Sequence, residues 1–135
     1  MELDEARAFL REHHRGILAT VRPDGRPQMS AVSVALDEAG RPAISTRENA
    51  YKVRRIRADP RVSLFVTSED FWSWIQIDGT ATVLSLPDAM EPLIAQYRAV
   101  AGEHPDWDDY RRAMEDQGRV LVRIDMERAG PDRHR

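Results

Sequence analysis

The spacing of hydrophobic and polar positions changes period several times along the chain. Apolar residues recur at helical spacing over 3–14, where Leu3, Ala6 and Leu10 form one stripe. The pattern then alternates with a period of two through three segments separated by turns that contain Gly25 and Gly40. These segments are expected strands at Gly16–Val21, Arg26–Leu36 and Pro42–Thr46. The first part of the chain therefore predicts a helix followed by a β-meander.

Helical spacing returns over Glu48–Asp59 and is stopped by Pro60. The remaining expected elements are two strands, two helices and a last strand: Val62–Thr67, Ser73–Leu84, Asp88–Ala101, a helix capped by Asp106, and Arg119–Met126. The residues from Ala129 onward are expected to form a frayed tail. Six short, antiparallel strands with three or four helices predict a mainly β fold, a β-barrel with helical additions.

Composition limits the classes of protein that fit this pattern. A chain of 135 residues is expected to form a single domain over 1–135. The absence of cysteine excludes disulfides, thiolate metal sites and a cysteine nucleophile. A net charge of −3 argues against nucleic acid as a partner. No apolar run approaches the ~20 residues of a membrane span, so we expect a cytoplasmic protein without membrane contact.

The densest group of positive charges lies after the third expected strand. Six of the twenty basic residues fall within residues 47–61, where only Glu48 and Asp59 oppose them, and Lys52 is the one lysine of the chain. Lys52 and Arg55 are three residues apart and share a helix face near its N-terminus. An anion there would meet free backbone N–H groups, the helix dipole and the Thr46 hydroxyl. This segment predicts a phosphate site, and a solvated basic helix is the alternative that composition leaves open.

Other residue types give weaker signals. Trp72 and Trp74 are two apart on an expected strand, so their side chains would point the same way and form a wall for a planar ligand or a packing surface. The histidines have no partner at metal-ligand spacing, and the serines lack a Gly-x-Ser-x-Gly setting. We therefore expect neither a metal site nor a catalytic acid, base or nucleophile among the side chains.

Several motifs, taken in their order and spacing, resemble a known family. Gly16–Val21, Asp24–Pro27, Ser45–Arg47 with Lys52, and Arg57–Val62 are similar to the pyridoxamine 5′-phosphate oxidase-like split-barrel superfamily. The stretches Trp72–Ala81 and Tyr97–Met114 look like the small actinobacterial branch that binds the deazaflavin coenzyme F420. The resemblance covers residues 4 to 127, and the arginine-rich composition fits a GC-rich actinobacterial source.

The resemblance implies a six-stranded antiparallel split β-barrel, similar to FMN-binding proteins, that forms a homodimer with cofactor sites at the interface. F420 is the implied cofactor, with FMN as the alternative. The residues carried over as cofactor-binding are Ser30, Ala31, Val32 and Ser33 along the ring system, Ser45, Thr46, Arg47, Lys52 and Arg55 at the phosphate, and Trp72 and Trp74 near the interface.

The implied activity is hydride transfer from reduced deazaflavin to a conjugated small-molecule acceptor, and a tetrapyrrole such as biliverdin is one such acceptor within the family. The cofactor carries the reactivity, which agrees with the absence of an evident acid–base pair. The segment Ala129–Arg135 lacks the substrate-binding ending of the true oxidases, which argues against their reaction. Two alternatives stay open: an FMN-dependent oxidase or reductase on the same fold, and a non-catalytic protein that binds F420, a flavin or haem.

Overall fold

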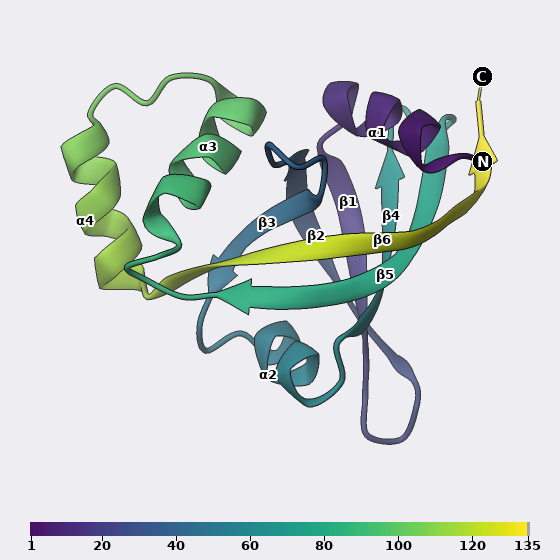
Figure 1. Ribbon diagram of the computed structural model, residues 1–135, viewed down its shortest axis with the longest axis horizontal. Helices are drawn as coiled ribbons and strands as arrows, with labels where there is room; N and C mark the ends of the chain where they lie inside the picture. The colour runs from purple at the N-terminus through teal and green to yellow at the C-terminus, as the bar shows by residue number, and fades with distance from the viewer. Residues whose placement is uncertain (135) are drawn as a thin grey trace.

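The computed structural model describes residues 1–134, and its six strands close into an antiparallel barrel (Figure 1). Around the barrel the strands follow the order β1-β2-β3-β6-β5-β4. Their bounds are Arg15–Val21 for β1, Pro27–Leu36 for β2, Pro42–Arg47 for β3, Arg61–Thr67 for β4, Trp74–Leu84 for β5 and Arg119–Arg133 for β6. The predicted six-stranded antiparallel split barrel is confirmed.

Four helices surround the barrel: α1 (Leu3–Glu12), α2 (Tyr51–Ala58), α3 (Met90–Ala101) and α4 (Trp107–Gln117). Figure 1 shows α1 and α2 at opposite ends of the barrel, with α3 and α4 together to one side. Asp106 caps α4 as predicted, because its carboxylate accepts the backbone N–H of Asp109 at 3.1 Å. The predicted cap at Asp88 is wrong, since α3 begins at Met90. None of the helices within residues 1–134 is long and apolar enough to cross a membrane.

Two hydrophobic clusters hold these elements together. The inward side chains of the strands fill the barrel with Leu18, Val34, Ile44, Leu64, Val66, Ile75, Ile77, Val122 and Ile124, and α1 adds Ala6, Phe9 and Leu10. A second cluster joins α3 and α4 to the outer face of β3 and β6 through Leu93, Ile94, Tyr110, Ala43 and Leu121. On the outer face of β1 and β2 the large apolar side chains of Ile17 and Met29 are 41% and 63% exposed.

The barrel is weakly joined along one line, which we call the seam. β2 pairs with β3 at only three positions, Val34 with Ile44, Ala35 with Ala43 and Leu36 with Pro42. Residues 27–33 of β2 pair with β1 but have no partner on β3, whose end pairs with β6 instead. In an antiparallel sheet such an unpaired edge presents backbone and side-chain groups to whatever lies beside it. The seam therefore makes residues 30–33 accessible.

The structure corrects two of the predictions. Residues 129–133 do not fray: they continue β6, where Ala129 pairs with Ile77 and is only 7% exposed. The physical reason is that β5 is long enough to pair with this segment. Trp72 lies in the turn over 68–73 and not on a strand, so it does not share a strand face with Trp74, the first residue of β5.

Candidate functional site

Three cations from different elements meet at the seam. The first turn of α2 carries Lys52, whose Nζ donates a hydrogen bond to Ser30 Oγ at 3.3 Å. The pairing of β3 with β6 sets Arg47 opposite Arg119. The positive charge of Arg119 acts on Lys52, and that of Arg47 acts on Arg119. We call Arg47, Lys52 and Arg119 the cation cluster.

The cation cluster is electrostatically uncompensated. Burial lowers the pKa of Lys52, and the charge of Arg119 lowers this pKa further. Burial also lowers the pKa of Arg119, with a second contribution from Arg47. Within residues 1–134 none of the three forms an ion pair. Arg47 is exposed, and Arg119 donates its Nε hydrogen to Gln117 at 2.8 Å. Lys52 and Arg119 are partly buried like charges without a counter-ion, and this favours the binding of an anion.

The neighbouring arginines of α2 and its flanks behave differently. Arg57 pairs with Glu48, and Arg61 pairs with Asp59 at 2.7 Å, which lowers the pKa of the Asp59 carboxyl to about 2. These arginines match the alternative of a solvated basic surface. The basic segment is thus divided: its outer arginines form surface ion pairs, whereas Lys52 faces the seam.

The residues predicted to bind the phosphate do not all lie on the same side of the barrel. Ser45 lines a cavity of about 400 Å³ together with Arg119, on the side of β3 that faces α3 and α4. Thr46 is 7% exposed and alternates to the opposite face of β3. Arg55 donates its Nε hydrogen to the Val21 carbonyl at 2.9 Å, so it is held beside β1. The charge that acts on Lys52 belongs to Arg119, a residue that the sequence did not single out.

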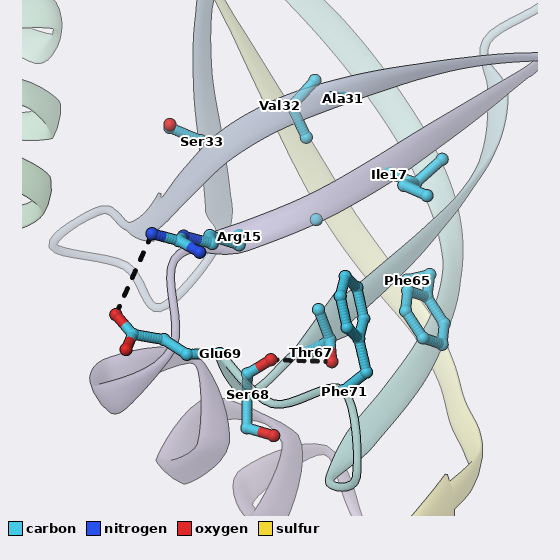
Figure 2. A pocket seen from close by; sticks show the side chains of 11 residues that line it. Arg15, Ile17, Ala31, Val32, Ser33, Phe65, Thr67, Ser68, Glu69 and Phe71 are labelled. Atoms are coloured by element: carbon cyan, nitrogen blue, oxygen red, sulfur yellow. Dashed lines mark hydrogen bonds and ion pairs between the residues drawn. The ribbon is translucent and has the colours of Figure 1, made fainter.

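An apolar groove lies on the outer face of the barrel beside the seam (Figure 2). Its volume is about 440 Å³, and its apolar wall includes Ile17, Phe65 and Phe71. Arg15 and Glu69 also line it, and their charged groups are 4.0 Å apart. Figure 2 shows Phe65, Phe71 and Ile17 among the residues that line the groove, together with the Arg15–Glu69 pair. Such a groove suits a planar, largely apolar ring system.

Small residues leave room on the floor of the groove. Ala31, Val32 and Ser33 of β2 all line it, as the resemblance implied for the cofactor ring. Gly16 has no space for a side chain, because an added Cβ would lie 2.6 Å from the Phe65 carbonyl oxygen. The other side of Ser33 borders the cavity that contains Arg119. β2 therefore connects the cation cluster to the groove, and the two together fit a ligand that joins an anionic group to a flat ring.

Two predicted residues lie at the edge of this site. Trp74 packs against the groove residue Phe65, with ring centroids 5.6 Å apart. Trp72 lies in the adjoining turn and is 51% exposed. Within residues 1–134 no group of three His, Asp or Glu side chains is arranged to hold a metal ion.

The lowered pKa of Lys52 predicts how anion binding depends on pH. As pH rises toward 10.5, the ordinary pKa of lysine, Lys52 loses its proton earlier than an ordinary lysine, so affinity for a phosphate-bearing ligand falls. The Lys52→Arg variant keeps its charge and is expected to bind with little change over this range. Titration of both proteins with F420 at several pH values measures the difference. Parallel pH profiles for the two proteins would contradict the assignment of Lys52.

The lowered pKa of Lys52 also determines how the free energy of unfolding of the ligand-free protein changes with pH. The folded-state pKa of Lys52 lies below its ordinary value of 10.5, so the unfolded chain binds more protons between the two values. The contribution of Lys52 to the free energy of unfolding therefore increases as pH rises through that window. The folded protein is therefore less stable with charged Lys52 than with neutral Lys52.

Comparison with known proteins agrees with the family resemblance of the sequence. The family model described as pyridoxamine 5′-phosphate oxidase matches residues 3–130. An F420H(2)-dependent biliverdin reductase of Mycobacterium tuberculosis (strain CDC 1551 / Oshkosh) is 31% identical over 127 residues, which are 93% of this chain and 84% of that protein. Its sequence is similar along nearly the full length of both chains.

Solved structures share the architecture. A conserved hypothetical protein of Mycobacterium tuberculosis superposes with a TM-score of 0.78 at 26% identity, covering 96% of this chain and 82% of the other. A structure described as an F420 reductase superposes with a TM-score of 0.70 at 23% identity, covering 91% and 94%. At 23% identity, the similarity to the F420 reductase structure is evidence for the fold only.

Proposed function

The chain belongs to the pyridoxamine 5′-phosphate oxidase-like family, and from this premise we propose that it is a reductase that uses the deazaflavin coenzyme F420. The observation that carries the proposal is the cation cluster, in which Arg47, Lys52 and Arg119 stand together without a carboxylate partner among the described residues. These three side chains would hold a phosphate group, whose negative charge would compensate theirs.

The residues along β2 fit the rest of such a cofactor. Ala31 and Val32 would lie against its ring system, because they line the apolar groove next to the seam. Ser33 lines the groove, and Ser30, on the opposite face of β2, contacts Lys52. When bound, reduced deazaflavin supplies a hydride. The protein contributes position, a water-poor surface and neutralisation of the phosphate charge.

The groove indicates how the chain handles an acceptor. Ile17, Phe65 and Phe71 would exclude water from one face of the reacting pair, which protects the hydride donor from competing reactions. Arg15 and Glu69 at the groove are charged and 72% and 87% exposed in their side chains, so they stay hydrated. Solvent is the proton source that this arrangement supplies to the reduced product.

F420 is favoured over FMN because the relative that is 31% identical carries F420H(2) in its name. FMN also has a phosphate and a flat ring, so the cation cluster alone does not separate the two cofactors. An FMN protein would be yellow after purification, whereas a deazaflavin enzyme would bind F420 more tightly than FMN. Titration of the purified protein with each cofactor decides between them.

Turnover is tested with reduced F420 and biliverdin as the probe acceptor, the choice of probe resting on the named activity of the relative. We expect the absorbance of oxidised deazaflavin to appear at a rate proportional to protein concentration. The control contains all components and the Lys52→Ala variant, which should be much slower at the same cofactor concentration. If the protein binds F420, but neither biliverdin nor a panel of conjugated ketones and quinones oxidises the bound reduced F420, the result would support a non-catalytic F420-binding protein instead.

We also propose that a second copy of the chain covers the exposed apolar part of the outer face of β1 and β2, and that the protein is cytoplasmic. Ile17 and Met29 on this face are 41% and 63% exposed, which is unfavourable in water for large apolar side chains. A dimer of this kind would place the groove at the interface. Analytical ultracentrifugation should give a dimer for the native chain and a monomer for Met29→Asp, and a native monomer would contradict the proposal.

A further inference from the structure

The turn between β4 and β5, residues 68–73, holds an aromatic side chain in a strained backbone. Phe71 has a φ of 68°, in the left-handed region that bulky residues rarely adopt, and its side chain is among the exposed large hydrophobics at 68%. No other non-glycine residue among those described has a positive φ. Strain of this kind persists only where surrounding contacts impose it, and it is concentrated at functional sites.

Hydrogen bonds across the turn impose the strain. Ser68 donates its backbone N–H to the Ser73 carbonyl at 2.8 Å, and the Phe71 N–H reaches the Ser68 carbonyl at 3.1 Å. The Ser68 hydroxyl donates to Asp70 at 2.6 Å and accepts the Ser73 N–H at 3.1 Å. The turn is therefore fixed before any ligand binds, and so is the direction in which Phe71 leaves it.

The side chain of Phe71 leaves the turn toward the apolar groove. Phe71 is one of its lining residues, and Figure 2 shows its ring between the turn and Phe65. On the β2 side the groove is bounded by Ala31 and Val32, and on β1 by Gly16 together with the larger Ile17 and Arg15. The small residues of β2 and the ring of Phe71 together leave a slot, a shape that admits flat molecules more readily than puckered ones.

We propose that Phe71 is a specificity-determining residue that selects flat, conjugated acceptors by contact with their ring face. The inference rests on the proposed function, since it places the acceptor between Phe71 and a cofactor ring that would lie against Ala31 and Val32 on the β2 side of the groove. The fixed turn explains the selectivity: a preorganised ring loses little conformational freedom on binding, so its contact energy is retained. A residue present only to cover the barrel would not need a left-handed conformation.

The test uses menadione, a flat bicyclic quinone, and 2-decalone, a saturated bicycle of similar size. Equilibrium dialysis against the protein without cofactor should show that Phe71→Gly weakens menadione binding about tenfold, while 2-decalone binding changes less than about twofold. Phe71→Tyr is the matched control, because it keeps the ring and should bind menadione like the native chain. Glycine accepts a positive φ, so the Phe71→Gly fold is expected to be at least as stable as the native fold.

The outcomes separate this inference from the proposed function. Equal menadione affinities for Phe71→Gly and Phe71→Tyr would overturn the role of Phe71, whatever the cofactor. A shift of Phe71→Gly from dimer to monomer with unchanged menadione binding would also overturn it, because Phe71 would then be an interface residue. A native protein that binds menadione in the predicted manner but not F420 would retain the slot and refute the F420 proposal.

Discussion

Replacing Lys52 by alanine is expected to weaken F420 binding by about a hundredfold, because the variant removes one of three cations that face the phosphate. Lys52 is partly buried and bonded to Ser30, so water screens its charge less than that of a surface lysine. A loss of ~2.7 kcal/mol corresponds to this factor. Fluorescence titration with F420 measures it.

The matched control for this prediction is Arg54→Ala. Arg54 is on the same helix, two residues away, and loses the same charge, but its side chain is exposed and donates to the Asn49 carbonyl at 3.3 Å. We expect its effect on F420 affinity to be below about threefold, as for an exposed charge at the rim of a site. Lys52→Arg should recover part of the lost affinity. Equal effects of Lys52→Ala and Arg54→Ala would show that only the general positive field matters.

Gly79→Ala is expected to destabilise the fold by ~3 kcal/mol or more, because there is no space for a side chain between β5 and β6. An added Cβ would lie 2.3 Å from the Asp125 carbonyl oxygen and 2.9 Å from Ile124 Cγ2. The backbone oxygen cannot move without separating the longest strand pair of the barrel, whose register already shifts between Asp78 and Gly79. Urea unfolding of the two proteins gives the difference in the free energy of unfolding.

Thr82→Ala controls for the general cost of changing β5. Thr82 is exposed on the same strand, so its replacement should cost less than about 1 kcal/mol through strand propensity alone. Nearly equal midpoints for Gly79→Ala and the native protein would mean that β5 and β6 are not packed as described. The cavity near the phosphate is lined by other residues, so the effect of Gly79→Ala on F420 affinity at low temperature should be small.

The features that could be predicted from the sequence are those encoded locally. Arg47 ends β3 and Lys52 lies in the first turn of α2, and both positions follow from local patterns in the sequence. The alternation along β2 likewise placed Ala31 and Ser33 on one face, where both now line the groove. Local periodicity was sufficient for these residues because each belongs to a single element or to adjacent ones.

Features that depend on contacts between distant segments were not predictable. Arg119 joins the cation cluster only because β6 pairs with β3, a register that no local pattern encodes. Phe71 was missed because its conformation is imposed by the Ser68 and Asp70 side chains, and bulky residues do not ordinarily mark left-handed turns. The tail was expected to fray because the last residues of a chain are often poorly ordered, yet β5 is long enough to pair with residues 129–133.

The most direct test of the cofactor assignment compares F420 with the same deazaflavin ring lacking the phosphate. Both ligands are titrated into the purified protein, and binding is followed by deazaflavin fluorescence. If the cation cluster holds the phosphate, F420 should bind about a hundredfold more tightly, and Lys52→Ala should remove most of that preference. Equal affinities of the native protein for the two ligands would contradict the account.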